Sequence, residues 1–325
     1  MAAADRSILE NPGARKTWDL LAQRYPDRHL TPDTRPRLEL GIDSMGWLDL
    51  TLAIRAQTGV ELEEEAVADI RTVRDLLEAV AAASEREEAP GADPFDDPEG
   101  FLDNDQKRWL EPTGPIATRV TRILFSVNRG LMKQLFQLTV EGRENLPNAG
   151  PYVIAPNHVS YLDSFALAAA LEFDIFQRTC WGGWTGAAFR NVFTRFISRL
   201  ARVVPVDPER GFLSSMAFGA AILRRENNLI WYPEGRRSPD GRLQPFKPGI
   251  GVLLDELPVK VVPVFIRGTA RVLPPGKFLQ GFFPVTVTFG PPLKPKALRE
   301  QGRGETPQER IIDALYDRLD RFQTH

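Results

Sequence analysis

The sequence PYVIAPNHVSYLDSFALAAAL, residues 151–171, sets an apolar run, a polar segment and a second apolar run one after another. Residues 151–155 are predicted to form a strand and residues 161–171 a helix. His158 lies between them, at the carboxyl end of the predicted strand. Open α/β sheets place their ligand sites at this end of their strands. The stretch therefore predicts an α/β fold with a functional group at the sheet edge.

His158 is the natural candidate for a general base. The other two histidines, His29 and His325, lie in a polar N-terminal stretch and at the last residue. An imidazole, with an ordinary pKa of about 6.5, suits proton transfer at neutral pH. Asp163, five residues later, can hydrogen-bond the far ring nitrogen and fix the tautomer. A His-x4-Asp pair is a weak signal by itself, because chance matches are common.

The alternation of apolar strands and amphipathic helices continues to the end of the chain. It predicts a mostly parallel α/β sheet with helices packed on it. Strands are expected at residues 228–232, 260–266 and 284–289, and helices at residues 186–200, 211–226 and 307–323.

The N-terminal third has a different pattern. Residues 17–26, 44–57 and 71–83 show helical spacing of apolar positions, which predicts a small all-α domain. The segment that follows is rich in acidic residues, Pro and Gly and lacks apolar periodicity. The predicted organisation is a helical domain over residues 1–83, a linker over residues 84–113 and an α/β domain over residues 114–325.

Composition limits the classes of protein to consider. The single cysteine, Cys180, excludes an internal disulfide framework and suits a reducing compartment. Too few His and Cys residues are present for a metal site to be expected. No secretory signal is evident, and no apolar run approaches the ~18 residues of a membrane span. We therefore expect a cytoplasmic chain that can still contact a membrane.

Charge is divided unequally along the chain. Residues 1–113 contain 25 acidic and 13 basic residues, a net of −12, whereas residues 114–325 contain 18 and 28, a net of +10. Such asymmetry indicates two parts with different partners, or two parts that attract one another. Nucleic acid is not an expected partner, because the arginines are dispersed and no nucleic-acid motif accompanies them.

Residues 112–140 contain no acidic residue. At helical spacing, four cations fall on one face and a row of apolar residues on the other, which is typical of a helix at an anionic membrane interface. The alternative is a surface helix, split at Gly130, whose apolar face packs on the sheet. The membrane interpretation puts residues 114–136 on the inner membrane face. The cations are Arg119, Arg122, Arg129 and Lys133; the apolar residues are Ile116, Val120, Ile123, Leu124, Val127, Leu131, Leu135 and Leu138.

The segment LGIDSMGW, residues 40–47, precedes a predicted helix. An ordinary N-cap at Asp43 or Ser44 is one interpretation. With its flanks, however, the segment resembles the acyl carrier protein family over roughly residues 15–83, with Met45 in place of the usual leucine. The resemblance implies a four-helix carrier domain with a phosphopantetheine arm on Ser44. It also implies two partners, a phosphopantetheinyl transferase and an acyl-loading ligase, since no adenylate-forming segment is present.

Four ordered blocks in the C-terminal part resemble the glycerolipid acyltransferase family of the lysophosphatidate type. The resemblance spans roughly residues 137–290. The third block has Tyr232 where the family has Phe and Arg236 where it has Thr. The matching residues are Asn157, His158, Ser160 and Asp163 in the first block, Pro233, Glu234, Gly235, Arg237 and Ser238 in the third, and Pro263 in the fourth.

The resemblance implies a role for each matched residue. His158 would deprotonate an acceptor hydroxyl that attacks an acyl thioester, and Asp163 would orient the imidazole. Glu234 and Gly235 would help hold the acceptor, and Arg237 would pair with its phosphate. Two further residues of the first block, Asn157 and Ser160, are also expected to bind substrate.

One block departs from the family pattern. The second motif usually ends Asp-Arg, and that arginine contacts phosphate, but here Asp207 is followed by Pro208. Either Arg210 or Arg202 substitutes, or the acceptor headgroup is not a simple glycerol phosphate.

The resemblances together imply an O-acyltransferase. It would move a fatty acyl group from a carrier-protein or CoA thioester to a lysophospholipid such as 1-acylglycerol-3-phosphate. Two alternatives stay open: a carrier and membrane-binding module without turnover, and an acyl thioesterase that uses water as acceptor.

Overall fold

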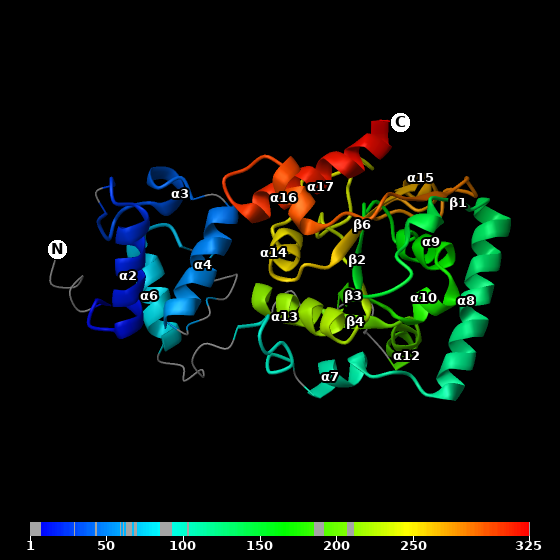
Figure 1. The fold of residues 1–325 in the computed structure, drawn as a ribbon, viewed down its shortest axis with the longest axis horizontal. Helices are drawn as coiled ribbons and strands as arrows, with labels where there is room; N and C mark the ends of the chain where they lie inside the picture. The colour runs from blue at the N-terminus through cyan, green and yellow to red at the C-terminus, as the bar shows by residue number, and fades with distance from the viewer. Residues whose placement is uncertain are drawn as a thin grey trace. The chain divides into compact units, whose positions relative to one another are not determined.

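The structure is a computed structural model. It describes residues 8–28, 30–42, 44–58, 70–84, 93–102, 104–184, 192–206 and 211–324, together with residues 60, 62 and 67. The chain divides into two compact units, one formed mainly by residues 1–100 and the other mainly by residues 101–325 (Figure 1).

The N-terminal unit is helical, as predicted. α2 begins where the Asn11 side chain accepts hydrogen bonds from the amides of Gly13 and Ala14. α6 begins with a capping box, in which Thr72 and Asp75 each accept a hydrogen bond from the other's amide. Apolar side chains of these helices form a core of their own. The helices are α2 (Pro12–Arg24), α3 (Pro36–Glu39), α4 (Ser44–Thr58) and α6 (Val73–Ser84).

The C-terminal unit is built on a seven-stranded sheet in the order β1-β7-β6-β2-β5-β3-β4. All neighbouring strands are parallel except β6 and β7. The mostly parallel α/β sheet expected from the sequence is confirmed. The strands are β1 (Thr139–Glu141), β2 (Tyr152–Pro156), β3 (Thr179–Trp184), β4 (Val203–Val206), β5 (Asn228–Ile230), β6 (Lys260–Arg267) and β7 (Thr286–Phe289).

Helices cover both faces of this sheet. Figure 1 shows α13, α14 and α17 on one side and α8, α9, α10 and α12 on the other. The helices and the one short 3-10 helix are α7 (Asn104–Leu110), α8 (Pro115–Phe136), η1 (Arg143–Asn145), α9 (Asp163–Ala170), α10 (Phe173–Gln177), α12 (Val192–Leu200), α13 (Gly211–Arg224), α14 (Gly249–Glu256), α15 (Thr269–Val272), α16 (Pro295–Gln301) and α17 (Pro307–Thr324).

α8 contradicts the surface-helix alternative for residues 112–140, whereas the membrane interpretation stays a prediction. It is one continuous helix across Gly130. Its apolar face does not pack on the sheet: six of the predicted residues on that face are exposed. The helix is held instead by Thr121, Phe125, Met132 and Phe136, which are buried on another face. None of the helices in the described residues is long and apolar enough to span a bilayer.

Part of the segment predicted as a linker is structured. α7 lies within it, and Leu110 at the end of that helix is 2% exposed. A short helix with few apolar positions leaves no periodic signal. The carrier and linker boundaries, and the count of four carrier helices, stay predictions.

Candidate active site

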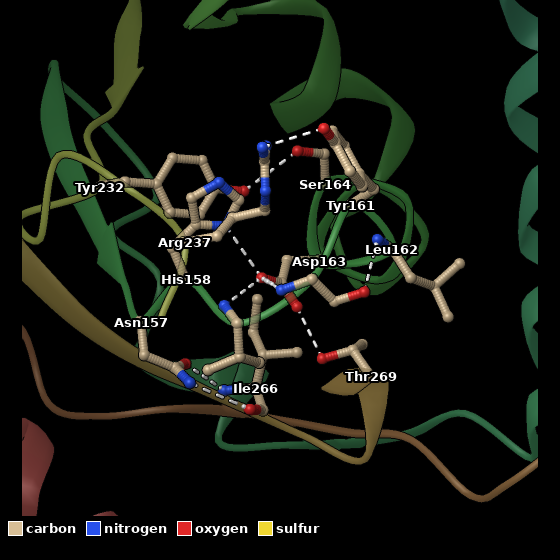
Figure 2. Close-up of polar contacts among 12 residues, drawn as sticks. Asn157, His158, Tyr161, Leu162, Asp163, Ser164, Tyr232, Arg237, Ile266 and Thr269 are labelled. Atoms are coloured by element: carbon tan, nitrogen blue, oxygen red, sulfur yellow. Dashed lines mark hydrogen bonds and ion pairs between the residues drawn. The ribbon is translucent and has the colours of Figure 1, made fainter. Parts of the chain in front are cut away.

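Three chain segments meet at one edge of the sheet because three neighbouring parallel strands end there. Residues 157–162 follow β2, residues 232–238 follow β5, and residues 268–269 follow β6. The carboxyl ends of adjacent parallel strands lie at the same edge, so side chains far apart in sequence come together. Figure 2 shows this group of residues.

His158 and Asp163 are in direct contact. The Nδ1 atom of His158 lies 2.9 Å from Oδ2 of Asp163, which is fully buried at the start of α9 (Figure 2). The same Oδ2 accepts hydrogen bonds from the amides of Val159 and Ser160 at 2.7 and 2.8 Å, and Oδ1 accepts one from Thr269 Oγ1 at 2.6 Å. A carboxylate that accepts from all these donors is an acceptor for Nδ1 as well, so the imidazole proton stays on Nδ1. Nε2 is therefore left with the lone pair that a base requires.

The imidazole is held from a second side by Tyr232. The two rings lie 4.1 Å apart at 30°, and the Tyr232 hydroxyl lies 3.1 Å from Ser164 Oγ. Burial, and then the nearby Asp163 carboxylate, raise the pKa of the Tyr232 hydroxyl, so it stays protonated. Among the described residues, none makes a hydrogen bond to Nε2 of His158, whose side chain is 16% exposed. The imidazole is therefore fixed in place, and its Nε2 atom is unengaged by the described residues.

The side chains of Asn157 and Ser160 form hydrogen bonds with backbone groups of the protein. The Asn157 side chain is 2% exposed and bonds both the amide and the carbonyl of Ile266 in β6, at 2.7 and 3.1 Å. Ser160 Oγ donates to the Leu273 carbonyl at 2.7 Å and accepts from the Leu162 amide at 3.0 Å. These contacts shape the loop that carries His158. The substrate-binding role expected for the two residues gains no support from them.

Glu234 also holds the loop in place. Its side chain is 1% exposed, with Oε1 accepting from the His158 amide at 2.6 Å and Oε2 from the Gln244 amide at 2.9 Å. The Ser238 amide in turn donates to the His158 carbonyl at 2.7 Å. Gly235, with φ +67°, makes the tight turn between them. The block thus bonds both the amide and the carbonyl of His158, and its expected role in holding the acceptor stays a prediction.

Glu234 makes the stability of the fold depend on pH. Burial, partly offset by the two backbone donors, raises the pKa of its carboxyl from 4.5 to about 7. As the pH rises through this window the unfolded chain releases the proton while the folded chain keeps it. The free energy of unfolding should therefore fall, by about 3 kcal/mol at most.

We expect Glu234→Gln to remove this part of the pH dependence, as measured by urea unfolding between about pH 4.5 and 7.5. The control is Glu300→Gln, which replaces an exposed carboxyl. The expectation would be contradicted if the free energy of unfolding of the Glu234→Gln protein changed with pH as steeply as that of the wild type.

Arg237 lies on an aromatic platform formed by Tyr161. Its guanidinium carbon is 3.7 Å from the centre of the Tyr161 ring, and Nη2 donates to the Tyr161 hydroxyl at 2.9 Å (Figure 2). Tyr161 is 50% exposed, so this pair borders the open side of the site. A guanidinium held by stacking keeps donors available for an anion.

Arg202 is not brought to this site. Its guanidinium bonds Cys180 Sγ and Asn227 Oδ1, which belong to the amino ends of β3 and β5. In the sheet register, Cys180 pairs with Leu229 and Leu229 with Val153. β2 continues for three residues beyond Val153, about 10 Å, before it reaches the segment that carries His158. Arg202 therefore stands at the opposite edge of the sheet.

Some predicted residues lie outside the part that the structure describes. Asp207, Pro208 and Arg210 fall in the gap between residues 206 and 211. Asp43 is also outside the described residues, and for Ser44 the structure gives only its position as the first residue of α4. In the described ranges, no group of three or more His, Cys, Asp or Glu side chains is placed to hold a metal ion.

Thr269 and Tyr232 are among the residues of the site that had no assigned role in the sequence analysis. Thr269, fully buried, follows β6 and is 106 residues from the Asp163 that it bonds. Tyr232 was noted only as a replacement for Phe. Only the position of Thr269 shortly after an apolar strand could have drawn attention to it.

Comparison with known proteins matches both units to families. Residues 137–267 match the family described as Acyltransferase, and residues 20–80 match the family described as Phosphopantetheine attachment site.

Curated relatives match about two fifths of the chain. The chloroplastic 1-acyl-sn-glycerol-3-phosphate acyltransferases LPAT1 of Arabidopsis thaliana and BAT2 of Brassica napus are 30% and 31% identical to this chain, over 146 and 145 residues. The 1-acyl-sn-glycerol-3-phosphate acyltransferase alpha of Homo sapiens is 31% identical over 142 residues. The alignments cover 41% to 43% of this chain and 39% to 47% of the relatives. The chain thus spans less than half the length of these relatives.

A solved structure shares the fold. The crystal structure of the 1-acyl-sn-glycerophosphate (LPA) acyltransferase PlsC from Thermotoga maritima matches with a TM-score of 0.50 and 21% identity. The match covers 69% of this chain and 84% of that one.

Proposed function

We propose that this chain transfers a fatty acyl group from a thioester to a lysophospholipid hydroxyl. The chain joins a phosphopantetheine attachment domain at residues 20–80 to an acyltransferase domain at residues 137–267. The observation that carries the proposal is the state of His158. Its Nδ1 is tied to buried Asp163, and no described residue hydrogen-bonds its Nε2. Such a histidine is arranged to accept one proton from a substrate.

The reaction follows from this arrangement. Nε2 of His158 takes the proton of the acceptor hydroxyl as its oxygen bonds to the thioester carbonyl carbon. The carbon–sulfur bond then breaks, and the departing sulfur takes the proton from the imidazolium. Asp163 stabilises that imidazolium between the two proton transfers, and the Tyr232 ring face adds to this stabilisation. The products are an ester and a free thiol, with no change of oxidation state.

The donor is proposed to be a thioester on the arm of the N-terminal domain, attached at Ser44. α4 begins at that residue, and a helix amino terminus favours the phosphodiester of such an arm. When bound, the arm supplies the thiol that carries the acyl group. A tethered domain reaches an effective concentration of about millimolar. The opposite net charges of residues 1–113 and 114–325 favour its docking on the acyltransferase domain.

The acceptor is proposed to carry a phosphate near Arg237, as in 1-acylglycerol-3-phosphate. We expect Arg237→Leu to raise KM for lysophosphatidate by about 10- to 100-fold with kcat little changed, because one charged hydrogen-bonding partner is lost. KM for monoacylglycerol, which lacks phosphate, should not change. Arg236→Leu, which removes the exposed neighbouring arginine, is the control. Equal KM changes for the two acceptors would rule out the phosphate contact.

The proposal as a whole is tested by mass spectrometry of products formed from an acyl thioester and a panel of lysolipids. Diacylated product supports acyl transfer. Free fatty acid as the only product would favour a thioesterase, and no product from any acceptor would favour the non-catalytic module.

We also infer that the protein acts at a membrane surface. The exposed apolar face of α8, flanked by arginines and without any acidic residue, suits an anionic interface. The acceptor would then reach His158 from the lipid.

A further inference from the structure

A second exposed apolar element lies far from α8 in sequence. Phe278 is 92% exposed, the highest value among the exposed large apolar side chains of the described residues, and Leu279 and Phe282 are 51% and 57% exposed. All three belong to the loop between α15 and β7. Contiguous apolar side chains in water indicate a surface that something covers.

This loop is fixed next to α8. The Phe282 ring lies 5.6 Å from the ring of Phe136, the last residue of α8. The Val285 amide donates to the Phe136 carbonyl at 2.9 Å. The loop apolar residues thus adjoin the end of α8 that exposes Leu131 and Leu135.

The loop is also fixed to the catalytic segment. The Leu273 carbonyl at its start accepts the hydrogen bond from Ser160 Oγ at 2.7 Å. On the other side, the Phe165 carbonyl in α9 accepts one from the Asn128 side chain of α8 at 2.9 Å, and Phe165 itself is 57% exposed. The segment that carries His158 is therefore joined to both exposed apolar elements.

The charges around the loop are positive. Residues 268–299 contain no acidic residue, and neither do residues 112–140 of the α8 segment. Arg271 and Lys277 are exposed in the loop region, and Lys133 is exposed on α8. Apolar side chains and cations, in two segments that themselves have no acidic residue, match the surface of an anionic bilayer, whose headgroups are negative and whose acyl region accepts aromatic rings.

We propose that residues 277–282 insert into the surface of an anionic bilayer as a second lipid-contacting element beside α8. The catalytic segment, joined to both, then faces the lipid from which an acceptor would come. The inference rests on the proposed function only in the choice of lipid as the occupant.

The test uses the whole chain and vesicles of phosphatidylcholine with about one third phosphatidylglycerol. Phe278→Ser combined with Leu279→Ser should lower the partition coefficient between water and vesicles, measured by flotation, by about tenfold or more. The reason is that two apolar side chains are no longer transferred from water into the lipid. The control is Leu38→Ser, since Leu38 is 76% exposed in the N-terminal unit. Its partition should equal that of the wild type.

A second, direct measurement of insertion distinguishes the loss of membrane contact from misfolding of the double variant. Cys180 is buried, so a Phe278→Cys variant that also carries Ser44→Ala, and therefore has no arm thiol, can be labelled with an environment-sensitive dye at one accessible thiol. Blue-shifted emission with these vesicles, quenched by spin-labelled lipid, supports insertion, and a Leu38→Cys label should respond to neither.

Other outcomes overturn the proposal. Unchanged partition of the double variant with no dye response would exclude insertion, and a change only in oligomeric state by light scattering would identify a second copy as the occupant. Acyl transfer to lysolipid in detergent micelles is measured in parallel. Its absence in the wild type would reject the proposed function while leaving the vesicle result to stand by itself.

Discussion

Replacing His158 with alanine is expected to lower kcat for acyl transfer by about 100- to 10,000-fold, the range that a general base contributes. The substitution removes the Nε2 lone pair while most of the loop contacts stay. The amides of Val159 and Ser160 and the hydroxyl of Thr269 still bond Asp163, and the His158 main chain is still clamped by Glu234 and Ser238. KM should change little, because the imidazole acts mainly in the transition state.

The measurement is steady-state formation of the diacylated product, with unfolding curves to show that the variant folds. His29→Ala, which changes a histidine outside residues 137–267, is the matched control. Equal product from His158→Ala and the wild type would remove the catalytic interpretation.

Replacing Ser44 with alanine is expected to abolish modification of the N-terminal domain completely. Incubation with a phosphopantetheinyl transferase and CoA should add the mass of one phosphopantetheine group to the wild type and nothing to Ser44→Ala. The reason is chemical: alanine has no hydroxyl to form the phosphodiester. Ser84→Ala, at the end of α6 in the same unit, is the control and should be modified normally.

The same variant separates the possible donors. If the arm on Ser44 delivers the acyl group, Ser44→Ala should lose transfer from the loaded chain but keep transfer from acyl-CoA added at high concentration. Dilution should not slow transfer in the loaded wild type, because the donor is tethered. A rate that falls in proportion to dilution would point instead to a separate carrier or to CoA.

The elements with strong apolar patterns were predictable from the sequence. β2 and β6 are buried, continuous apolar runs, and the amphipathic pattern of residues 307–323 matches α17. β3 was missed because its sequence, TCWGGW, has two glycines and no β-branched run. It forms because β5 and β4 bond it on both sides, and such tertiary pairing outweighs local preference.

The site was predictable in its residues and less so in their roles. The pair His158 and Asp163 lies close in sequence, so spacing alone indicated their contact. Asn157, Ser160 and Glu234 have partners 76 to 113 residues away, and most of these partners are backbone groups without a sequence signature. The same limit applies to Arg202, since its place at the far edge follows from the strand register.

Asp163 accepts four hydrogen bonds, two of them from the loop amides after β2 and one from the segment after β6, while Glu234 ties in the segment after β5. Separating the three segments would leave buried carboxylates and buried amides without hydrogen-bond partners. Local opening of this site should therefore cost nearly as much free energy as unfolding of the sheet, so the arrangement around His158 is expected to persist as long as the domain stays folded.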